Sequence, residues 1–196
     1  MLKAEKTPGV SRTARSCQVL RQTMIRLLKE KELEKITVTE LCLHAQINRS
    51  TFYEYYDDIH DLMNDIETNF LEKADQLCAY ITAHVLPPET VTSLILEFIS
   101  DEKETLSLFI SSYRYTSFLK RIHKKVTDLF RSKLMQNFTF PETVSHEKLE
   151  HTIQFLSSGF YSVYLDWIQN DCREDPKELA SQTVALSQAC LNALLC

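Results

Sequence analysis

Residues 35–63 read KITVTELCLHAQINRSTFYEYYDDIHDLM, and the rest of the chain is organised around this stretch. Thr37 is suited to begin a helix, because its hydroxyl can accept a hydrogen bond from a free backbone N–H of the first turn. Glu40 stands three residues later, where its side chain can reach back to the N–H of Thr37 and close a capping box. We therefore expect a short helix over residues 38–45.

A second helix start lies at Asn48, eleven residues after Thr37. Asn is among the preferred N-cap residues, so we expect a second short helix over residues 49–56. A turn of about three residues, Gln46 to Asn48, joins the two helices. This layout is typical of a helix-turn-helix, whose second helix enters the DNA major groove.

The first turn of the second helix carries Arg49, Ser50 and Thr51. Arg can donate a bidentate pair of hydrogen bonds to guanine, and Ser and Thr can bond base edges or phosphate. These are the residue types that a helix needs at the end that lies against the bases.

Residues 52–56 read FYEYY. Phe52 and Tyr56 are four residues apart, so we expect them to share the buried face of the helix. Tyr53 and Tyr55 would then point outward. The alternative, that the whole run is a core segment, is disfavoured because five consecutive residues of a helix cannot all face one core.

Residues 48–62, NRSTFYEYYDDIHDL, resemble the signature of the TetR family of bacterial transcriptional regulators, and the resemblance extends from Arg12 to about Phe70. It implies an all-helical dimer with an N-terminal DNA-binding domain and a C-terminal effector or dimerisation domain. By position, Arg49 and Ser50 would face bases. The other implied DNA-binding residues would hold the phosphate backbone or make apolar contacts, and they are Thr37, Thr39, Thr51, Tyr53 and Tyr55.

The sequence departs from the family pattern at three positions. The family usually has Gly at the end of the first helix and in the turn, where this chain has Glu32 and Gln46. Gly ends a helix in the left-handed conformation at little steric cost, so we expect Gln46 to be modestly strained or the turn to be built differently. Ile59 stands where the family often has a Lys, which puts one phosphate contact in doubt.

Charge is distributed unevenly along the chain. Residues 1–56 contain ten Lys and Arg and six acidic residues, a net charge of +4, so the remainder carries −9 of the total of −5. A basic end on an acidic body suits a protein that binds DNA at one end only.

Composition excludes several classes of protein. The chain of 196 residues is 44% hydrophobic and 25% charged, which is ordinary for a globular protein. It has no apolar run long enough to span a membrane and no apolar segment near Met1 that would serve as a secretory signal, so we expect a cytoplasmic protein. The two glycines exclude a Gly-rich phosphate loop, and no catalytic motif is present, so we expect no enzyme activity.

Six cysteines and six histidines show no spacing that indicates a metal site or a disulfide framework. Glu147 and His151 lie one helical turn apart, but two ligands without a third are weak evidence for a metal. We therefore expect no metal and no cofactor.

The apolar pattern predicts an all-α fold. A first helix over residues 12–31 completes a three-helix domain, and a long fourth helix runs from its cap at Asp58 to about His84, where Pro87 and Pro88 interrupt it. We expect domains at residues 1–57 and 58–196. Further helices are expected at residues 90–100, 103–113, 116–136, 146–170 and 176–195.

Small residues on the last two helices predict a dimer interface. A Gly within a helix costs up to about 1 kcal/mol, which close approach of another helix can offset. Two helices from each subunit would form a four-helix bundle with a two-fold axis, although an ordinary packing face within one chain is the alternative. The predicted interface residues are Ser158, Gly159, Ser162, Ala185, Ala189 and Ala193.

The body is rich in aromatic residues that either line an effector site or form the core. The basic run Lys120 to Lys125 either binds an anionic effector or is a solvated helix face. The residues that we predict to bind an effector are Phe98, Phe109, Tyr113, Phe118, Phe155, Tyr161 and Tyr164.

These features predict a transcriptional repressor that binds double-stranded DNA as a homodimer at a pseudo-palindromic operator, under the control of an effector in the body. One alternative is a regulator or co-activator that is controlled by a protein partner and has no small-molecule pocket. Another is an all-helical enzyme or binding module with a vestigial DNA-binding end.

Overall fold

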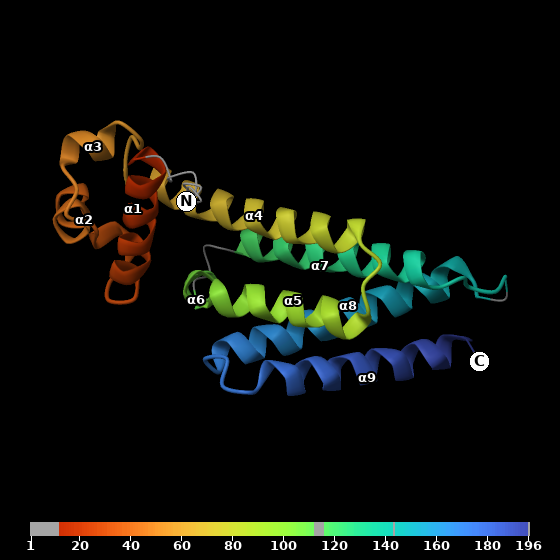
Figure 1. Ribbon diagram of the computed structural model, residues 1–196. Helices are drawn as coiled ribbons and strands as arrows, with labels where there is room; N and C mark the ends of the chain where they lie inside the picture. Colours follow the sequence, from red (N-terminus) through yellow and green to blue (C-terminus); the bar gives the residue numbers. More distant parts are fainter. Residues whose placement is uncertain (1–11, 112–115, 143, 196) are drawn as a thin grey trace, which may run out of the picture. The chain divides into compact units, whose positions relative to one another are not determined.

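The computed structural model describes residues 12–111, 116–142 and 144–195, which are helical and contain no strand (Figure 1). The predicted all-α fold class is confirmed. The chain divides between Asn69 and Phe70 into two compact units. None of the helices in these ranges combines the length and the apolar character that spanning a bilayer takes.

The first unit contains α1 (Arg12–Leu28), a 3₁₀ turn η1 (Leu33–Lys35), α2 (Val38–Ala45), α3 (Arg49–Tyr53) and the beginning of α4 (Ile59–Ala83). α1 packs against α2, and α2 packs against α3. Apolar residues from all four helices are buried together in this unit, because each helix presents one apolar face. They include Leu20, Met24, Leu27, Leu41, Phe52, Leu62 and Ile66.

The second unit contains the remainder of α4 together with five further helices. Within it α5 packs along α9, and α7 packs along α8 (Figure 1). Where the structure describes them, the bounds agree with the predicted helices to within two residues, and the predicted end at residue 113 lies outside the described residues. These helices are α5 (Pro88–Asp101), α6 (Lys103–Ser111), α7 (Thr116–Asn137), α8 (His146–Gln169) and α9 (Pro176–Leu195).

Local residues explain where the body helices begin. Pro88 occupies the first position of α5, where the missing N–H costs nothing. Ser145 caps α8 by accepting a hydrogen bond from Lys148 N at 3.2 Å. Asp175 caps α9 by accepting from Lys177 N at 2.7 Å.

Two predicted helix ends were wrong. The second short helix stops at Tyr53 and not at residue 56, because Tyr55 N–H bonds back three residues to Phe52 O at 3.0 Å and tightens the last turn. The chain must then turn so that Asp58 can cap α4, accepting from Asp61 N at 2.9 Å. α1 stops at Leu28.

The predicted domain boundary at residues 57 and 58 lies at the start of α4, whereas the two compact units divide within α4. Compact packing does not show which part of a chain folds by itself. The boundary at residues 57 and 58 therefore stays a prediction.

Candidate nucleic-acid interface and ligand cavity

Residues 37–56, called here the recognition segment, are held by caps close in the sequence. The Thr37 hydroxyl accepts from Glu40 N at 3.2 Å, and the Asn48 side chain accepts from Ser50 N at 3.4 Å. Both predicted N-caps are therefore present. The Glu40 carboxylate accepts from Lys31 Nζ instead of closing the expected capping box.

The turn between α2 and α3 is built on Gln46. This residue has φ 54° and ψ 38°, the left-handed conformation, which is one of the two outcomes that the missing Gly left open. Gln46 N–H donates to Leu43 O at 3.2 Å, and Ile47 N–H donates to Cys42 O at 3.0 Å, which is a Schellman motif. The turn thus keeps the geometry that usually requires Gly, at the cost of a strained Gln.

α3 has one buried and one exposed face. Phe52 is fully buried and its ring centroid lies 5.6 Å from that of the buried Tyr56. Tyr53 is 51% exposed. Burial of Phe52 and Tyr56 fixes the rotation of the segment and leaves its opposite side to solvent.

The predicted DNA-binding residues fall on the surface of the first unit. Thr37, Thr39, Arg49 and Ser50 are exposed. Thr51 and Tyr55 are half-buried, so Tyr55 points outward less than we expected. The hydroxyl of Thr37 is already used as the cap of α2.

Arg49 differs from the other cations near the recognition segment. Arg21, Lys31 and Lys35 are paired with carboxylates of the same unit. Arg49 makes no ion pair with any residue that the structure describes. Its guanidinium is thus available to an external partner without breaking an internal contact.

A hydrogen-bond network that the sequence did not predict holds the end of the recognition segment. The Tyr56 hydroxyl donates to Asp65 Oδ2 at 2.5 Å. Arg21 donates to the same carboxylate through Nε at 2.6 Å and Nη2 at 3.0 Å. Burial and the bond to Asp65 raise the pKa of Tyr56, and the bond to Asp65 raises the pKa of Arg21. The network therefore ties the recognition segment to α1 and α4.

Residues 88–189 match the TetR C-terminal family described as "Transcriptional regulator C-terminal region". The chain belongs to the TetR family of transcriptional regulators. This family assignment makes the chain a transcriptional regulator and not an enzyme. In the first unit, α2 and α3 have the helix-turn-helix layout with which regulators place a helix in the DNA major groove.

Individual relatives agree with this assignment. The chain is 21% identical over 170 residues to "Uncharacterized HTH-type transcriptional regulator YxbF" of Bacillus subtilis (strain 168), a match that covers 83% of this chain. It spans only 42% of that relative's length.

Solved structures share the fold of this TetR-family regulator. The "Dihydroxyacetone kinase operon activator DhaS" has a TM-score of 0.65 at 15% identity, with 89% of this chain and 94% of that chain covered. The "fatty acid degradation regulator FadR from Bacillus halodurans" has a TM-score of 0.62 at 14% identity, with 94% and 96% covered. At such low identities these likenesses show the fold alone.

The second unit of this regulator encloses a cavity of about 240 Å³. α4, α5, α6, α7, α8 and α9 all contribute to its lining, which is mostly apolar. An engineered cavity of roughly 150 Å³ is enough to bind benzene, so this cavity can hold a somewhat larger apolar group.

Only some of the predicted effector residues line the cavity. Phe98, Tyr161 and Tyr164 line the cavity. Phe109 and Phe118 do not line it; they are fully buried in the core with ring centroids 4.3 Å apart.

Phe155 does not line the cavity, and its side chain is 70% exposed on α8. Tyr113 lies outside the described residues. Tyr164, by contrast, is buried at the cavity wall, and burial raises its pKa to about 12. Its hydroxyl therefore remains protonated at neutral pH and can donate a hydrogen bond.

Small side chains gather on the exposed sides of α8 and α9. Gly159, Ser162, Ala185 and Ala189 are exposed, and Ser158 is half-buried. A Cβ added to Gly159 would meet no atom within 4 Å, so packing within the chain does not require Gly there. The side chain of Ala193 lies outside the described part of the chain.

Apolar side chains accompany the small residues. Phe155 precedes Gly159 by one helical turn, and Leu186 on α9 is 65% exposed. We call the exposed side formed by Phe155, Gly159, Ala185, Leu186 and Ala189 the α8/α9 face. Large apolar side chains beside small ones are typical of a surface that another helix covers.

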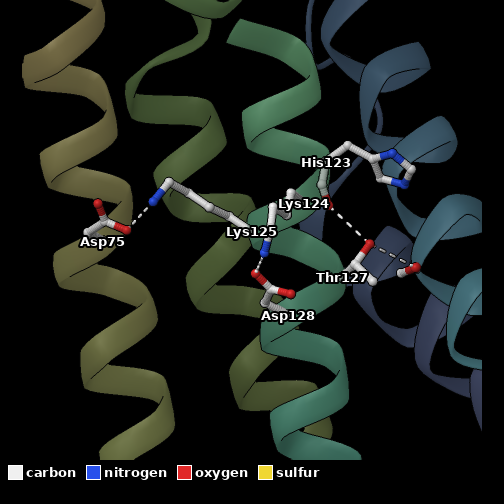
Figure 2. A network of polar contacts seen from close by, with 7 residues as sticks. Asp75, His123, Lys124, Lys125, Thr127 and Asp128 are labelled. Atoms are coloured by element: carbon white, nitrogen blue, oxygen red, sulfur yellow. Dashed lines mark hydrogen bonds and ion pairs between the residues drawn. The ribbon is translucent and has the colours of Figure 1, made fainter. Parts of the chain in front are cut away.

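The basic run on α7 is largely paired. Lys125 Nζ pairs with Asp75 of α4, and Lys124 Nζ lies 2.5 Å from Asp128 Oδ2 (Figure 2). Lys125 also borders the cavity, but its charge is already matched. Among the residues that the structure describes, no three His, Cys, Asp or Glu side chains gather where they could hold a metal ion.

Proposed function

We propose that this TetR-family regulator is a homodimeric, cytoplasmic repressor that reads a pseudo-palindromic operator with α3 of each subunit and is released when an effector fills the cavity. One observation carries the DNA-binding part of the proposal. Arg49 and Ser50 are exposed at the start of α3, while Phe52 and Tyr56 anchor the opposite side of the segment. Arg49 is then free to donate two hydrogen bonds to a guanine.

The α8/α9 face supports the proposed dimer. A two-fold interface uses the same patch on both subunits, so a single self-complementary face is sufficient. Exposed Phe155 and Leu186 supply apolar area, and Gly159 and Ala185 allow close approach of the partner helix. A two-fold axis would also place two α3 helices on two half-sites, which predicts a palindromic operator.

The path of α4 supports control by an effector. Phe70, Ala74 and Leu77 of α4 line the cavity, and Asp65 of the same helix binds Tyr56 of the recognition segment. A ligand that binds one position of α4 better than another would shift the population of that position. Because α4 supplies residues to both units, such a shift would change operator affinity.

Selection of bound duplexes from genomic fragments tests the DNA-binding proposal. We expect a palindromic motif, and we expect Arg49→Ala to lose about 1–3 kcal/mol of discrimination at one base pair of each half-site. Arg49→Lys is the matched control, because it keeps the charge but loses the fork that binds guanine bidentately. It should lose discrimination and keep most of the affinity for random DNA.

Three results would count against this assignment. An equal loss of affinity on operator and random DNA would show that Arg49 only contacts phosphate. A purified protein that selects no duplex at all would remove the proposal. Affinity that does not weaken as salt rises would contradict it as well, because phosphate contacts release counterions.

A further inference from the structure

Lys133 occupies an apolar position on α7. It borders the cavity together with Val126, Leu129 and Phe130 of the same helix, and it is only 9% exposed. Spacings of three, four and seven residues place these side chains on one face of the helix. A charged residue is rare at such a position unless a partner compensates for its burial.

The partners of Lys133 within the chain are neutral. Its Nζ donates to His84 O at 2.6 Å and to Gln136 Oε1 at 2.7 Å. No carboxylate among the described residues forms an ion pair with it. An ammonium has three donors, so these two bonds leave one donor for a further acceptor.

Three other cations of α7 are paired with carboxylates. Lys125 is paired with Asp75, Lys124 with Asp128, and Arg131 with Glu150 (Figure 2 shows the first two). Lys133 is more buried than these three, yet it lacks a carboxylate. Burying a charge without an opposite charge beside it is unfavourable, so the position is costly for the chain alone.

Part of this cost is offset locally. His84 directly follows α4, whose C-terminal end carries a partial negative charge of about half an elementary charge. Lys133 therefore caps α4, and Gln136 assists by donating to Thr82 O at 3.4 Å. Capping explains the bond to His84 but not why a Lys side chain lines an otherwise apolar cavity.

We propose that the cavity binds an amphiphile with an apolar body and a single carboxylate, and that Lys133 pairs with that carboxylate. The inference rests on the proposed control by an effector and specifies the effector's chemical class. One unpaired ammonium matches one negative charge, whereas a phosphate monoester would bring nearly two. The apolar walls accept the apolar body of the amphiphile, and its carboxylate neutralises the charge of Lys133.

Calorimetric titration of the full chain with octanoate and octan-1-ol tests this inference. The two probes share their apolar chain and differ in the charged head. We expect octanoate to bind at least about tenfold more tightly than octanol, because hydrogen bonds between charged groups are the stronger ones. Lys133→Gln should reduce this ratio to near one and leave octanol affinity unchanged, since its amide can still donate to His84 O.

Lys133→Met is a second variant, which removes both the charge and the donor and should abolish the preference equally. Lys124→Met is the matched control, because Lys124 lies on the same helix but is exposed and does not border the cavity. It should keep the preference. A role of Lys133 in capping alone would lower stability in Lys133→Met without changing the ratio between the probes.

The failing outcomes can be told apart. Equal binding of both probes to the natural chain, or a preference that survives Lys133→Gln and Lys133→Met, would overturn the carboxylate assignment and leave effector control standing. Binding of neither probe would overturn the carboxylate assignment too. The DNA-reading part of the proposed function is decided independently, by whether the protein selects a duplex.

Discussion

The recognition segment and the cavity are held together by contacts of very different sequence range. The caps at Thr37 and Asn48 join residues three and two positions apart. At the cavity, Lys133 bonds to a carbonyl 49 positions away, and Lys125 pairs with a carboxylate 50 positions away. The first region is shaped by its own residues, whereas the second exists only once distant helices have packed.

This difference suits the two tasks that we propose. A surface that reads DNA must keep one geometry, and short-range caps maintain that geometry whatever the rest of the chain does. A site that responds to a ligand must join elements that can move relative to each other. The contact from Lys133 to His84 joins α7 to the end of α4, so displacing it would loosen two helices at once.

Asp65 tests whether the recognition segment is shaped by its own residues alone, and its substitution should have the largest effect on stability. It links Arg21, 44 positions away, to the recognition segment through Tyr56. Arg21 and Asp65 side chains are only 25% and 27% exposed, so Asp65→Ala leaves a half-buried guanidinium and a buried hydroxyl without their acceptor. We expect the free energy of unfolding to fall by about 2–3 kcal/mol, measured by urea denaturation.

Glu72→Ala is the control for Asp65→Ala, because Glu72 is an exposed acidic residue on the same helix. It should change stability by no more than about 0.5 kcal/mol. Operator affinity should also drop in Asp65→Ala and not in Glu72→Ala. If both variants kept the stability and affinity of the natural chain, short-range contacts alone would be enough to hold the recognition segment.

The same distinction explains what the sequence could predict. Caps at Thr37, Asn48 and Asp58 depend on neighbouring residues, so all three were predicted from the sequence. The missing Gly left two outcomes open for the turn, a left-handed Gln46 or a turn of another kind, and the structure has the first. Helix bounds in the body followed from apolar periodicity.

Contacts between distant positions could not be predicted in this way. Nothing in the local sequence joins Arg21 to Asp65, and Phe155 looked like the other body aromatics although it is exposed. Lys133 had a signal that we did not use, a basic residue in register with Val126 and Phe130 on an apolar stripe. Such a residue on the core face of a predicted helix points to a buried charge.

The α8/α9 face extends the comparison to contacts beyond one chain. Gly159→Leu should weaken the dimer at least about tenfold, roughly 1.4 kcal/mol, because the larger side chain would hold two closely packed helices apart. The described part of the chain leaves room for an added Cβ, since a Cβ at Gly159 meets no atom within 4 Å. Sedimentation velocity across a concentration series measures the change.

Ala79→Leu is the matched control, because Ala79 is also exposed in mid-helix but lies on α4. It adds a comparable apolar side chain away from the α8/α9 face and should leave the dimer unchanged. A dimer of undiminished strength in Gly159→Leu would assign the interface to another surface. A dimer weakened equally by both variants would point to a general effect of surface apolarity.

Gln46→Gly should have the smallest effect on the free energy of unfolding. The sign of this effect shows whether relief of strain in the folded chain outweighs the greater freedom of Gly in the unfolded chain. Releasing a non-Gly residue from the left-handed conformation gains about 1–2 kcal/mol, whereas Gly in the unfolded chain loses about 0.5–1 kcal/mol through its greater freedom. The exposed Gln46 side chain gives up no buried contact, so urea denaturation should show a gain of about 0.5–1 kcal/mol.

Gln22→Gly, at an exposed position inside α1, is the control. It should lose about 1 kcal/mol, because only the greater freedom of Gly in the unfolded chain and the lost helix propensity act there. Operator affinity should stay the same in Gln46→Gly, since the Schellman bonds use only backbone atoms of residue 46. A loss of stability in both variants would mean that the turn holds Gln46 without strain, and the recognition segment would then be shaped by the packing around it more than by its own residues.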